Sequence, residues 1–378
     1  MSTHPPLPRT LVFSTILLFL FCAGVLQRPG DLYAQQKEKT PSPVVLTGTQ
    51  LLSLTSSVVA GQEYAIQVSL PQHYSDTTRS FPVVYVLDGQ WDFALVQAIY
   101  GQQYYDGFVP GLIIVGITWG GAHPNVDSLR ARDYTPTHGD QIPQSGQAAR
   151  FLSFMKQELI PFIDGRFRTS KDRTLMGSSF GGLFTLYAMF EETSLFKRYI
   201  AASPAVMWAN DGINQFEEEY SQKTPRLPVK LYMVIGQYEY QGAFQSFVKR
   251  LKKYEGLQFE TKVIENTGHS GNKAEGFTRG LQYVFARPSL SLDPAILKQY
   301  VGEYEVAPQM RAKIYIDQGR LMGRAPDGSV QVLHAESEQD FYVKGIFLFL
   351  HFKKDEQGKV TGFQLDQYGS TQFVKKVE

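Results

Sequence analysis

The stretch from Thr174 to Gly182 constrains the fold of this chain more than any other. It contains the pattern Gly177-x-Ser179-x-Gly181, which follows an apolar, strand-like run and precedes a run with helical periodicity at 183–190. A serine in a strained turn between a strand and a helix needs small neighbours, because the two elements approach closely there. The N-terminus of the helix would direct free N–H groups at negative charge beside Ser179. The pattern predicts a nucleophilic serine; the alternative is a plain tight connection.

Strand-like and helical patterns alternate on both sides of this stretch. Apolar runs typical of strands covered on both faces in a parallel sheet lie at 81–87 and 111–117. Further strands are expected at 198–203, 228–236 and 259–265. A pair of strands is expected between 56 and 70, and a helix between 147 and 167 that Pro161 kinks or ends. Segments 118–125 and 130–137 are expected to be loops. The alternation predicts an α/β fold with a doubly wound, mainly parallel sheet.

The pattern of predicted secondary structure changes at about residue 288. Short strand-like segments between polar turns follow, among them 302–306, 312–316, 347–352 and 360–365. They predict a small antiparallel β domain, either a sandwich or a barrel. We therefore expect an α/β domain at 44–287 and an accessory β domain at 288–378.

The N-terminus has the composition of an export signal. Arg9 precedes an apolar run at 11–26, and polar sequence follows. We expect a signal peptide at 1–34 and a linker at 35–43, and hence a periplasmic or extracellular protein. An uncleaved membrane anchor is the alternative. Lipid attachment at Cys22 is disfavoured, because the preceding Phe21 is bulky.

Composition excludes several classes of partner. The chain has 37 Lys and Arg against 36 Asp and Glu, whereas a protein that follows a nucleic-acid backbone needs a basic excess. There is no Walker or dinucleotide-binding glycine pattern, and the only cysteine lies in the export signal. The mature chain can therefore form no disulfide and no thiolate metal site. We expect no metal, no organic cofactor and no nucleic acid.

A serine hydroxyl becomes nucleophilic only when a base takes its proton, and the base needs a carboxylate beside it. His269 is the one histidine that follows Ser179 within the α/β region, and it lies just after the last strand-like run. Glu239 follows the strand that ends at Gly236, so the order is serine, acid, histidine. Asp211 is the alternative acid. Without catalysis, His269 would cap a turn and Glu239 would be a solvated loop charge.

An oxyanion hole would complete this arrangement. The N–H of the residue after the nucleophile, here Phe180, is the expected first donor. The second should come from the loop after an earlier strand, where Asp88-Gly89-Gln90 offers the N–H of Gln90. A plain turn at Gly89 is equally compatible with the sequence.

Several motifs together resemble a known family. They are Tyr85–Gln90, Arg132–Thr137, Met176–Gly182, Ser203–Trp208 and Gly268-His269. From about Val44 to Arg287 the chain resembles the putative esterase family of α/β hydrolases, which includes enterobactin esterases, esterase D and feruloyl esterases. The resemblance implies a serine esterase with Ser179 and His269 in catalysis, and Glu239 at a position where the family has Asp or Glu. The β tail resembles an accessory domain.

Aromatic and basic residues are the candidates for substrate contacts. Aromatic side chains expected in loops around the site are Trp91, Trp119, Trp208, Tyr104, Tyr105 and Tyr134, and they favour flat or apolar groups. Arg130 and Arg132 are candidates for an anionic group such as a catecholate; salt bridges to Asp127 or Asp133 are the alternative. From this set we take Trp91, Arg132, Tyr134 and Trp208 as the substrate-binding residues.

The sequence thus predicts an exported serine esterase that acts on a small-molecule ester through an acyl-enzyme. A siderophore trilactone hydrolase is the alternative within the same class. An alternative of another class is a noncatalytic protein that binds a glycan or an envelope partner on a hydrolase scaffold. Membrane attachment, if any, is expected only through the N-terminus.

Overall fold

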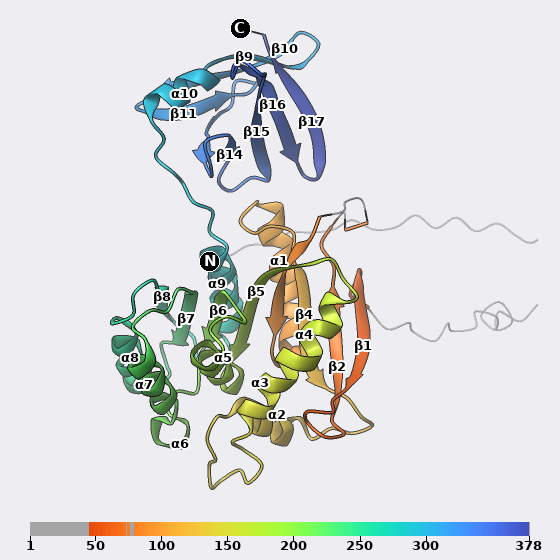
Figure 1. The fold of residues 1–378 in the computed structure, drawn as a ribbon, viewed down its shortest axis with the longest axis vertical. Coiled ribbons are helices and arrows are strands. Elements are labelled where there is room, and N and C mark those ends of the chain that lie inside the picture. The colour runs from red at the N-terminus through yellow and green to blue at the C-terminus, as the bar shows by residue number, and fades with distance from the viewer. Residues whose placement is uncertain (1–44, 73, 76–78, 378) are drawn as a thin grey trace, which may run out of the picture. The chain divides into compact units, whose positions relative to one another are not determined.

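The computed structural model describes residues 45–72, 74–75 and 79–377 (Figure 1). The predicted export signal and linker lie outside these residues. Within the described part of the chain, no helix is both long and apolar enough to cross a membrane.

The α/β region is built on an eight-stranded sheet with the order β1-β2-β4-β3-β5-β6-β7-β8. The strands are β1 Thr49–Thr55, β2 Glu63–Ser69, β3 Phe81–Val86, β4 Ile113–Trp119, β5 Thr169–Ser178, β6 Arg198–Ala202, β7 Lys230–Gly236 and β8 Gln258–Ile264. β1 and β2 pair antiparallel, as do β2 and β4, and all other neighbours are parallel. The prediction of a mainly parallel, doubly wound sheet is confirmed.

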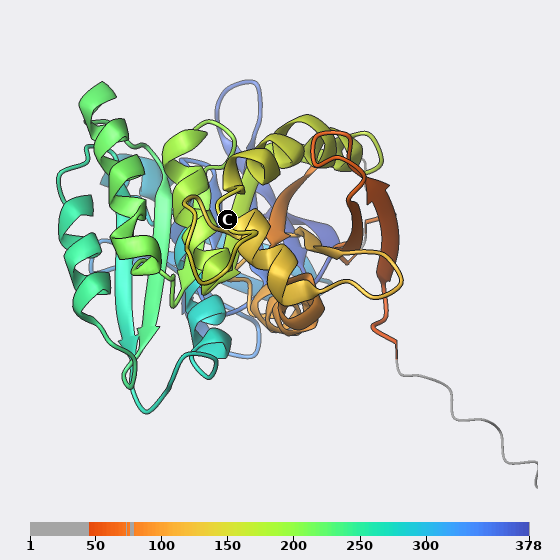
Figure 2. The ribbon, with the colours of Figure 1, turned by 90° about the horizontal axis from the view of Figure 1, so that it is seen from below.

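Helices cover both faces of this sheet (Figure 2). They are α1 Gly89–Tyr105, α2 Val126–Tyr134, α3 Ala148–Phe154, a π-helical turn at Met155–Leu159, α4 Ile160–Asp164, α5 Phe180–Glu191, α6 Trp208–Asp211, α7 Ile213–Lys223, α8 Gly242–Leu251 and α9 Lys273–Val284. Side chains alternate along each strand: Val83 and Tyr85 pack on the face that α3 and α5 cover, whereas Val84 and Val86 pack under α1 and α9. Continuous apolar strands follow from burial on both faces.

Two local predictions were wrong, and the prediction that Pro161 disturbs the helix within 147–167 is confirmed. The first strand pair lies at 49–55 and 63–69 rather than within 56–70. The segment expected to be a loop at 130–137 is largely helix α2, which Asn125 caps by accepting a hydrogen bond from the Ser128 N–H (3.1 Å). The helix expected at 147–167 departs from α geometry before Pro161, in the π-helical turn, because proline supplies no N–H to the regular ladder.

The C-terminal region forms a separate antiparallel sheet with the order β12-β11-β10-β9-β17-β16-β15-β14-β13. Its strands are β9 Gly302–Ala307, β10 Met310–Asp317, β11 Arg320–Arg324, β12 Val330–Val332, β13 His334–Ala335, β14 Asp340–Tyr342, β15 Leu348–Lys354, β16 Val360–Gln367 and β17 Ser370–Lys376. Tyr300, Tyr304, Phe352 and Phe363 fill its core. The predicted antiparallel β region is confirmed, and helix α10, Pro294–Tyr300, was not predicted.

Close packing of α9 on the sheet gives a test with a matched control. A Cβ added at Gly280 would lie 2.6 Å from Cγ2 of the buried Ile200, whereas a Cβ at Gly101 in α1 would meet nothing within 4 Å. We expect Gly280→Ala to lower the free energy of unfolding by about 1–3 kcal/mol. Gly101→Ala should raise it by about 0.5–1 kcal/mol, since alanine favours a helix. Urea unfolding measures the free energy of unfolding of both variants. Equal changes in Gly280→Ala and Gly101→Ala would contradict the close packing of α9 on the sheet.

Candidate active site

Ser179 lies in a strained turn between β5 and α5. Its backbone has φ 59° and ψ −118°, outside the regions that a serine normally adopts. Only glycine fits at position 177, because a Cβ there would lie 2.6 Å from the carbonyl carbon of Gly181. The Ser179 N–H donates to the Ala202 carbonyl (3.0 Å), and the Ala205 N–H donates to the Ser179 carbonyl (3.1 Å). The turn is therefore fixed by its neighbours in the position that the sequence predicts.

His269 and Glu239 meet in the loops after β8 and β7. His269 Nδ1 lies 2.6 Å from Glu239 Oε2, and the other carboxylate oxygen accepts from the Gly236 N–H at 2.7 Å. Burial raises the pKa of Glu239, but hydrogen bonds from Ser203, His269 and Gly236 outweigh it and hold that pKa below its ordinary value. Glu239 is therefore an ionised partner for the imidazole.

The alternative acid lies elsewhere. Asp211 ends α6 in a left-handed backbone conformation (φ 58°) and makes no hydrogen bond to His269 in the described structure.

The loops of Ser179, Glu239 and His269 all follow parallel strands, so they share one edge of the sheet. Among the described residues, Ser179 Oγ makes no hydrogen bond to His269 or to any other group, whereas His269 and Glu239 are in direct contact.

The loop after β3 carries the N–H of Gln90, the second of the two predicted oxyanion donors. Asp88 has a left-handed backbone (φ 53°), and α1 begins at the next residue, so the N–H of Gln90 belongs to the unpaired first turn. Arg130 holds the Asp88 carboxylate through two hydrogen bonds of 3.0 and 2.8 Å. The Asp88 N–H donates to Tyr134 Oη at 3.1 Å. Phe180 likewise begins α5, so both predicted oxyanion donors are first-turn N–H groups.

An aromatic strip runs beside the nucleophile. The Arg130 guanidinium lies 5.4 Å from the Trp91 ring and 5.3 Å from the Phe180 ring. Phe180 in turn packs edge-on against Trp208, with ring centroids 4.9 Å apart. Trp91 is 51% exposed, so one end of the strip faces solvent. Trp91 and Trp208 thus lie on either side of Arg130 and Phe180, the residue after Ser179, and their contact with substrate stays a prediction.

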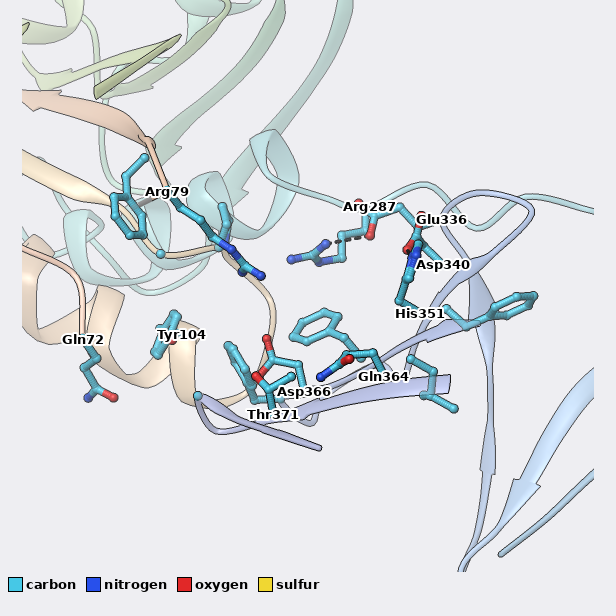
Figure 3. A pocket seen from close by; sticks show the side chains of 18 residues that line it. Gln72, Arg79, Tyr104, Arg287, Glu336, Asp340, His351, Gln364, Asp366 and Thr371 are labelled. Atoms are coloured by element: carbon cyan, nitrogen blue, oxygen red, sulfur yellow. Dashed lines mark hydrogen bonds and ion pairs between the residues drawn. The ribbon is translucent and has the colours of Figure 1, made fainter. Parts of the chain in front are cut away.

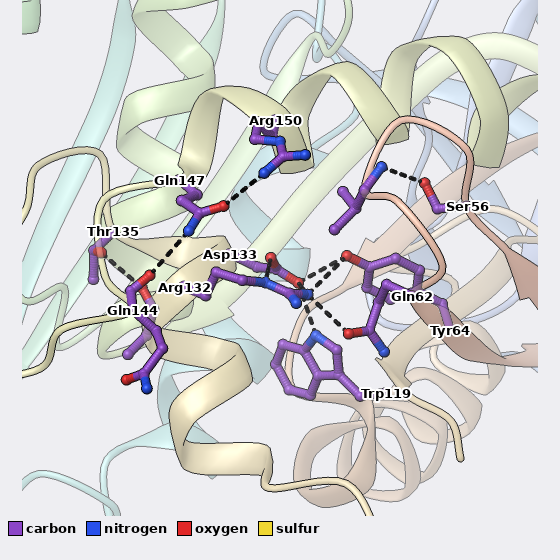
Figure 4. Close-up of polar contacts among 12 residues, drawn as sticks. Ser56, Gln62, Tyr64, Trp119, Arg132, Asp133, Thr135, Gln144, Gln147 and Arg150 are labelled. Atoms are coloured by element: carbon purple, nitrogen blue, oxygen red, sulfur yellow. Dashed lines mark hydrogen bonds and ion pairs between the residues drawn. The ribbon is translucent and has the colours of Figure 1, made fainter.

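Two predicted substrate contacts are wrong. Tyr134 is fully buried, because its ring packs against Trp119, Phe151 and Phe184 and its hydroxyl supports the Asp88 loop. Arg132 directs its donors inward to Asp133 and Gln62 (Figure 4). Both face the interior because 126–134 is a helix packed on the core.

The remaining aromatic candidates also lie away from the site. Trp119 is buried at the end of β4, where its Nε1 donates to Asp133 (2.8 Å). Tyr104 and Tyr105 end α1, at the far end of the helix from Gln90. Of the six aromatic side chains expected around the site, only Trp91 and Trp208 flank Ser179.

Sequence reasoning missed four polar residues around the site. Ser203 and Asn272 bind the Glu239 carboxylate at 2.6 and 3.1 Å. Lys273, the first residue of α9, donates to the buried Asp92 in the first turn of α1 (2.8 Å). The sequence could have indicated Asn272 and Lys273 by their position, because they follow His269 closely and lie at the start of a predicted helix.

The C-terminal sheet carries its own polar cluster. His351 pairs with Asp340, which also accepts from Ser337 (2.6 Å), and Arg287 donates to Glu336 at 2.7 Å (Figure 3). Burial raises the pKa of Asp340, but Ser337 and His351 outweigh it and lower that pKa. No group of three His, Cys, Asp or Glu side chains arranged for a metal occurs among the described residues.

The sheet order and the turn at Ser179 together define an α/β hydrolase fold. The chain belongs to the putative esterase family, which matches residues 57–272. The predicted resemblance to that family is confirmed. Residues 286–376 match a domain of unknown function, DUF3471.

Two relatives and one solved structure illustrate the similarity. The chain is 34% identical over 175 residues to the siderophore triacetylfusarinine C esterase of Aspergillus fumigatus, a match that covers 44% of this chain and 59% of the relative. It is 29% identical over 216 residues to the ferri-bacillibactin esterase BesA of Bacillus subtilis, covering 53% and 74%. The match thus spans less than two thirds of the fungal relative. The crystal structure of the BES protein from Bacillus cereus aligns with a TM-score of 0.59 at 25% identity, over 65% of this chain and 98% of that one.

The pair of Lys273 and Asp92 gives a test of how α9 is joined to α1. Burial raises the pKa of Asp92, and Lys273 opposes that rise. We expect Lys273→Met to lower the free energy of unfolding by about 3 kcal/mol, because it leaves a buried carboxylate without its partner. Without Lys273 the pKa of Asp92 rises further, so the folded protein takes up a proton more readily. The deficit should therefore be smaller at about pH 5 than at about pH 8.

The control is Lys156→Met, which breaks a more exposed pair with Glu192 at a similar distance, 2.7 Å. Its effect on urea unfolding should stay below about 1 kcal/mol. A Lys273→Met deficit that is small, or that grows at acid pH, would contradict the account of a buried, partnered charge.

Proposed function

We propose that the protein is a serine carboxylic-ester hydrolase that works through an acyl-enzyme on Ser179. The observation that carries this proposal is the 2.6 Å contact between His269 Nδ1 and Glu239 Oε2 at the sheet edge that also presents the Ser179 turn. Membership of the esterase family supports catalysis over the noncatalytic binding role. Export through the N-terminal segment is part of the proposal, and Edman sequencing of the secreted protein tests cleavage after Ala34.

Each residue has a defined chemical task in this reaction. Glu239 accepts a hydrogen bond from the Nδ1–H of His269, which keeps Nδ1 protonated and leaves Nε2 free to take the Ser179 hydroxyl proton as the oxygen attacks the ester carbonyl. The N–H groups of Phe180 and Gln90 bind the oxyanion that forms. His269 then protonates the leaving alcohol, and an acyl-serine remains. Water, deprotonated by His269, releases the acid and restores Ser179.

A second candidate names the substrate more closely: a siderophore ester. One relative is named a siderophore esterase and another a ferri-bacillibactin esterase, and the strip that includes Trp91, Arg130 and Phe180 leads from exposed aromatic surface to the residue after the nucleophile. Flat aryl groups such as catecholates pair with exposed aromatic surface. The exposed end of the strip at Trp91 can accept a substrate larger than a simple ester.

The first test is the steady-state rate on a short-chain aryl ester. We expect Ser179→Ala to lower kcat by about 10⁵-fold and Glu239→Ala by about 10³-fold, because the first removes the nucleophile and the second frees His269 from its orienting carboxylate. Asp211→Ala is the matched control and should change kcat less than about twofold, since it makes no hydrogen bond to His269. An Asp211→Ala loss as large as that of Glu239→Ala would reverse the choice of acid.

The second test separates the siderophore candidate from a general esterase. We expect Trp91→Ala to raise KM about tenfold for catecholate esters, through loss of an aromatic contact, and to leave KM for acetate esters of small alcohols within about twofold. Competition between the two ester classes in one reaction measures the change in kcat/KM. An equal effect on both would show that Trp91 does not select aryl groups.

A further inference from the structure

Two buried polar side chains hold the Glu239 oxygen that does not face His269. Ser203 Oγ donates to Oε1 at 2.6 Å, and Asn272 Nδ2 donates to the same oxygen at 3.1 Å. Ser203 is 2% exposed and Asn272 is fully buried. With the Gly236 N–H at 2.7 Å, Oε1 accepts three hydrogen bonds while Oε2 is left for His269.

The amide of Asn272 can have only one orientation here. Its Nδ2 lies 3.1 Å from Glu239 Oε1, 2.9 Å from the Gly268 carbonyl oxygen and 3.1 Å from the His269 carbonyl oxygen. All three of these oxygens are acceptors, so a nitrogen must occupy the position. Asn272 therefore binds both the acid and the backbone of the base.

The two side chains come from different loops. Ser203 follows β6 with a left-handed backbone (φ 42°), and its N–H donates to the Val234 carbonyl of β7 at 2.7 Å. Asn272 precedes α9, and its Nδ2 also lies 2.7 Å from Ser203 Oγ. The loops after β6, β7 and β8 are thus joined at one carboxylate.

We propose that Ser203 and Asn272 are positioning residues that fix the Glu239 carboxylate for His269, an inference that rests on the esterase function proposed above. Rotation of the carboxylate would break three hydrogen bonds to Oε1 at once, so Oε2 stays directed at His269 Nδ1. The imidazole is then held with Nδ1 protonated and Nε2 available. Ser203 acts through Glu239 alone, whereas Asn272 acts through Glu239 and also through the backbone of Gly268 and His269.

A double-mutant cycle tests this dependence. Ser203→Ala and Asn272→Asp are made in the wild type and in Glu239→Ala, with two readouts: kcat and KM on a short-chain aryl ester, and the rate at which a fluorophosphonate labels Ser179. In the wild type we expect each variant to lower kcat and the labelling rate about tenfold with KM unchanged. Asn272→Asp is nearly isosteric but sets a carboxylate oxygen against acceptors. In Glu239→Ala, Ser203→Ala should lower the rates no more than about twofold further, and Asn272→Asp should cost clearly less than in the wild type, because only its contacts to the Gly268 and His269 backbone remain to be lost.

Ser69→Ala is the control, because Ser69 is also a buried serine but lies where β2 pairs with the start of β4, at the opposite edge of the sheet. Equal losses in the presence and absence of Glu239 would show a general packing role and overturn the proposal, as would full activity of both variants. If Ser179 is labelled but no ester is hydrolysed, the proposed function fails while the labelling rates still decide this inference. If Ser179 is not labelled at all, both fail.

Discussion

The arrangement of the α/β domain depends on one close approach of backbone to backbone, between Gly177 and Gly181. A side chain at Gly177 would collide with the carbonyl group of Gly181, so this strand and helix can meet only if position 177 lacks a Cβ. The meeting forces Ser179 into a positive φ, and the Ala202 and Ala205 backbone groups hold it there. The strain is offset by these bonds and by the buried helix α5.

Charges near the site are held by partners, and each pairing fixes a loop. Asp88 is bound by Arg130 next to the N-terminus of α1, and Asp92 one turn further on is bound by Lys273. Glu239 is bound by neutral donors and by His269, which keep it ionised although it is partly buried. These ion pairs and hydrogen bonds fix the positions of loops. The buried carboxylates hold in place the loops that carry the proposed oxyanion donors and the base.

The sequence predicted the elements whose signals are local. Strands β3 and β4 lie in apolar runs, and the elbow glycines mark a strand-to-helix turn that requires them, so Ser179 and the following helix could be placed without a structure. Helix α2 was missed because 126–134 has no apolar periodicity, although Asn125 offered a cap. Helix α10 carries a similar signal, because Asp293, which precedes Pro294, accepts a hydrogen bond from the Ala295 N–H at 2.7 Å.

The site was predictable only in part, because its side chains come from distant positions. Glu239 could be chosen by chain order, but its contacts to Ser203 and Asn272 join residues 36 and 33 positions apart and depend on the sheet order. Tyr134 and Arg132 were assigned to substrate because their motif was read as a loop. Helix α2 turns those side chains to the core, and the local signal for that helix was its cap at Asn125.

The central claim is a covalent acyl group on Ser179, and intact-mass spectrometry during rapid mixing with a slowly deacylating aryl ester tests it most directly. The account predicts a burst of the released alcohol equal to the enzyme concentration. It also predicts a mass increase of one acyl group on the peptide that contains Ser179. Steady turnover with no burst, no adduct at any time and no adduct in a rapidly quenched sample would contradict it.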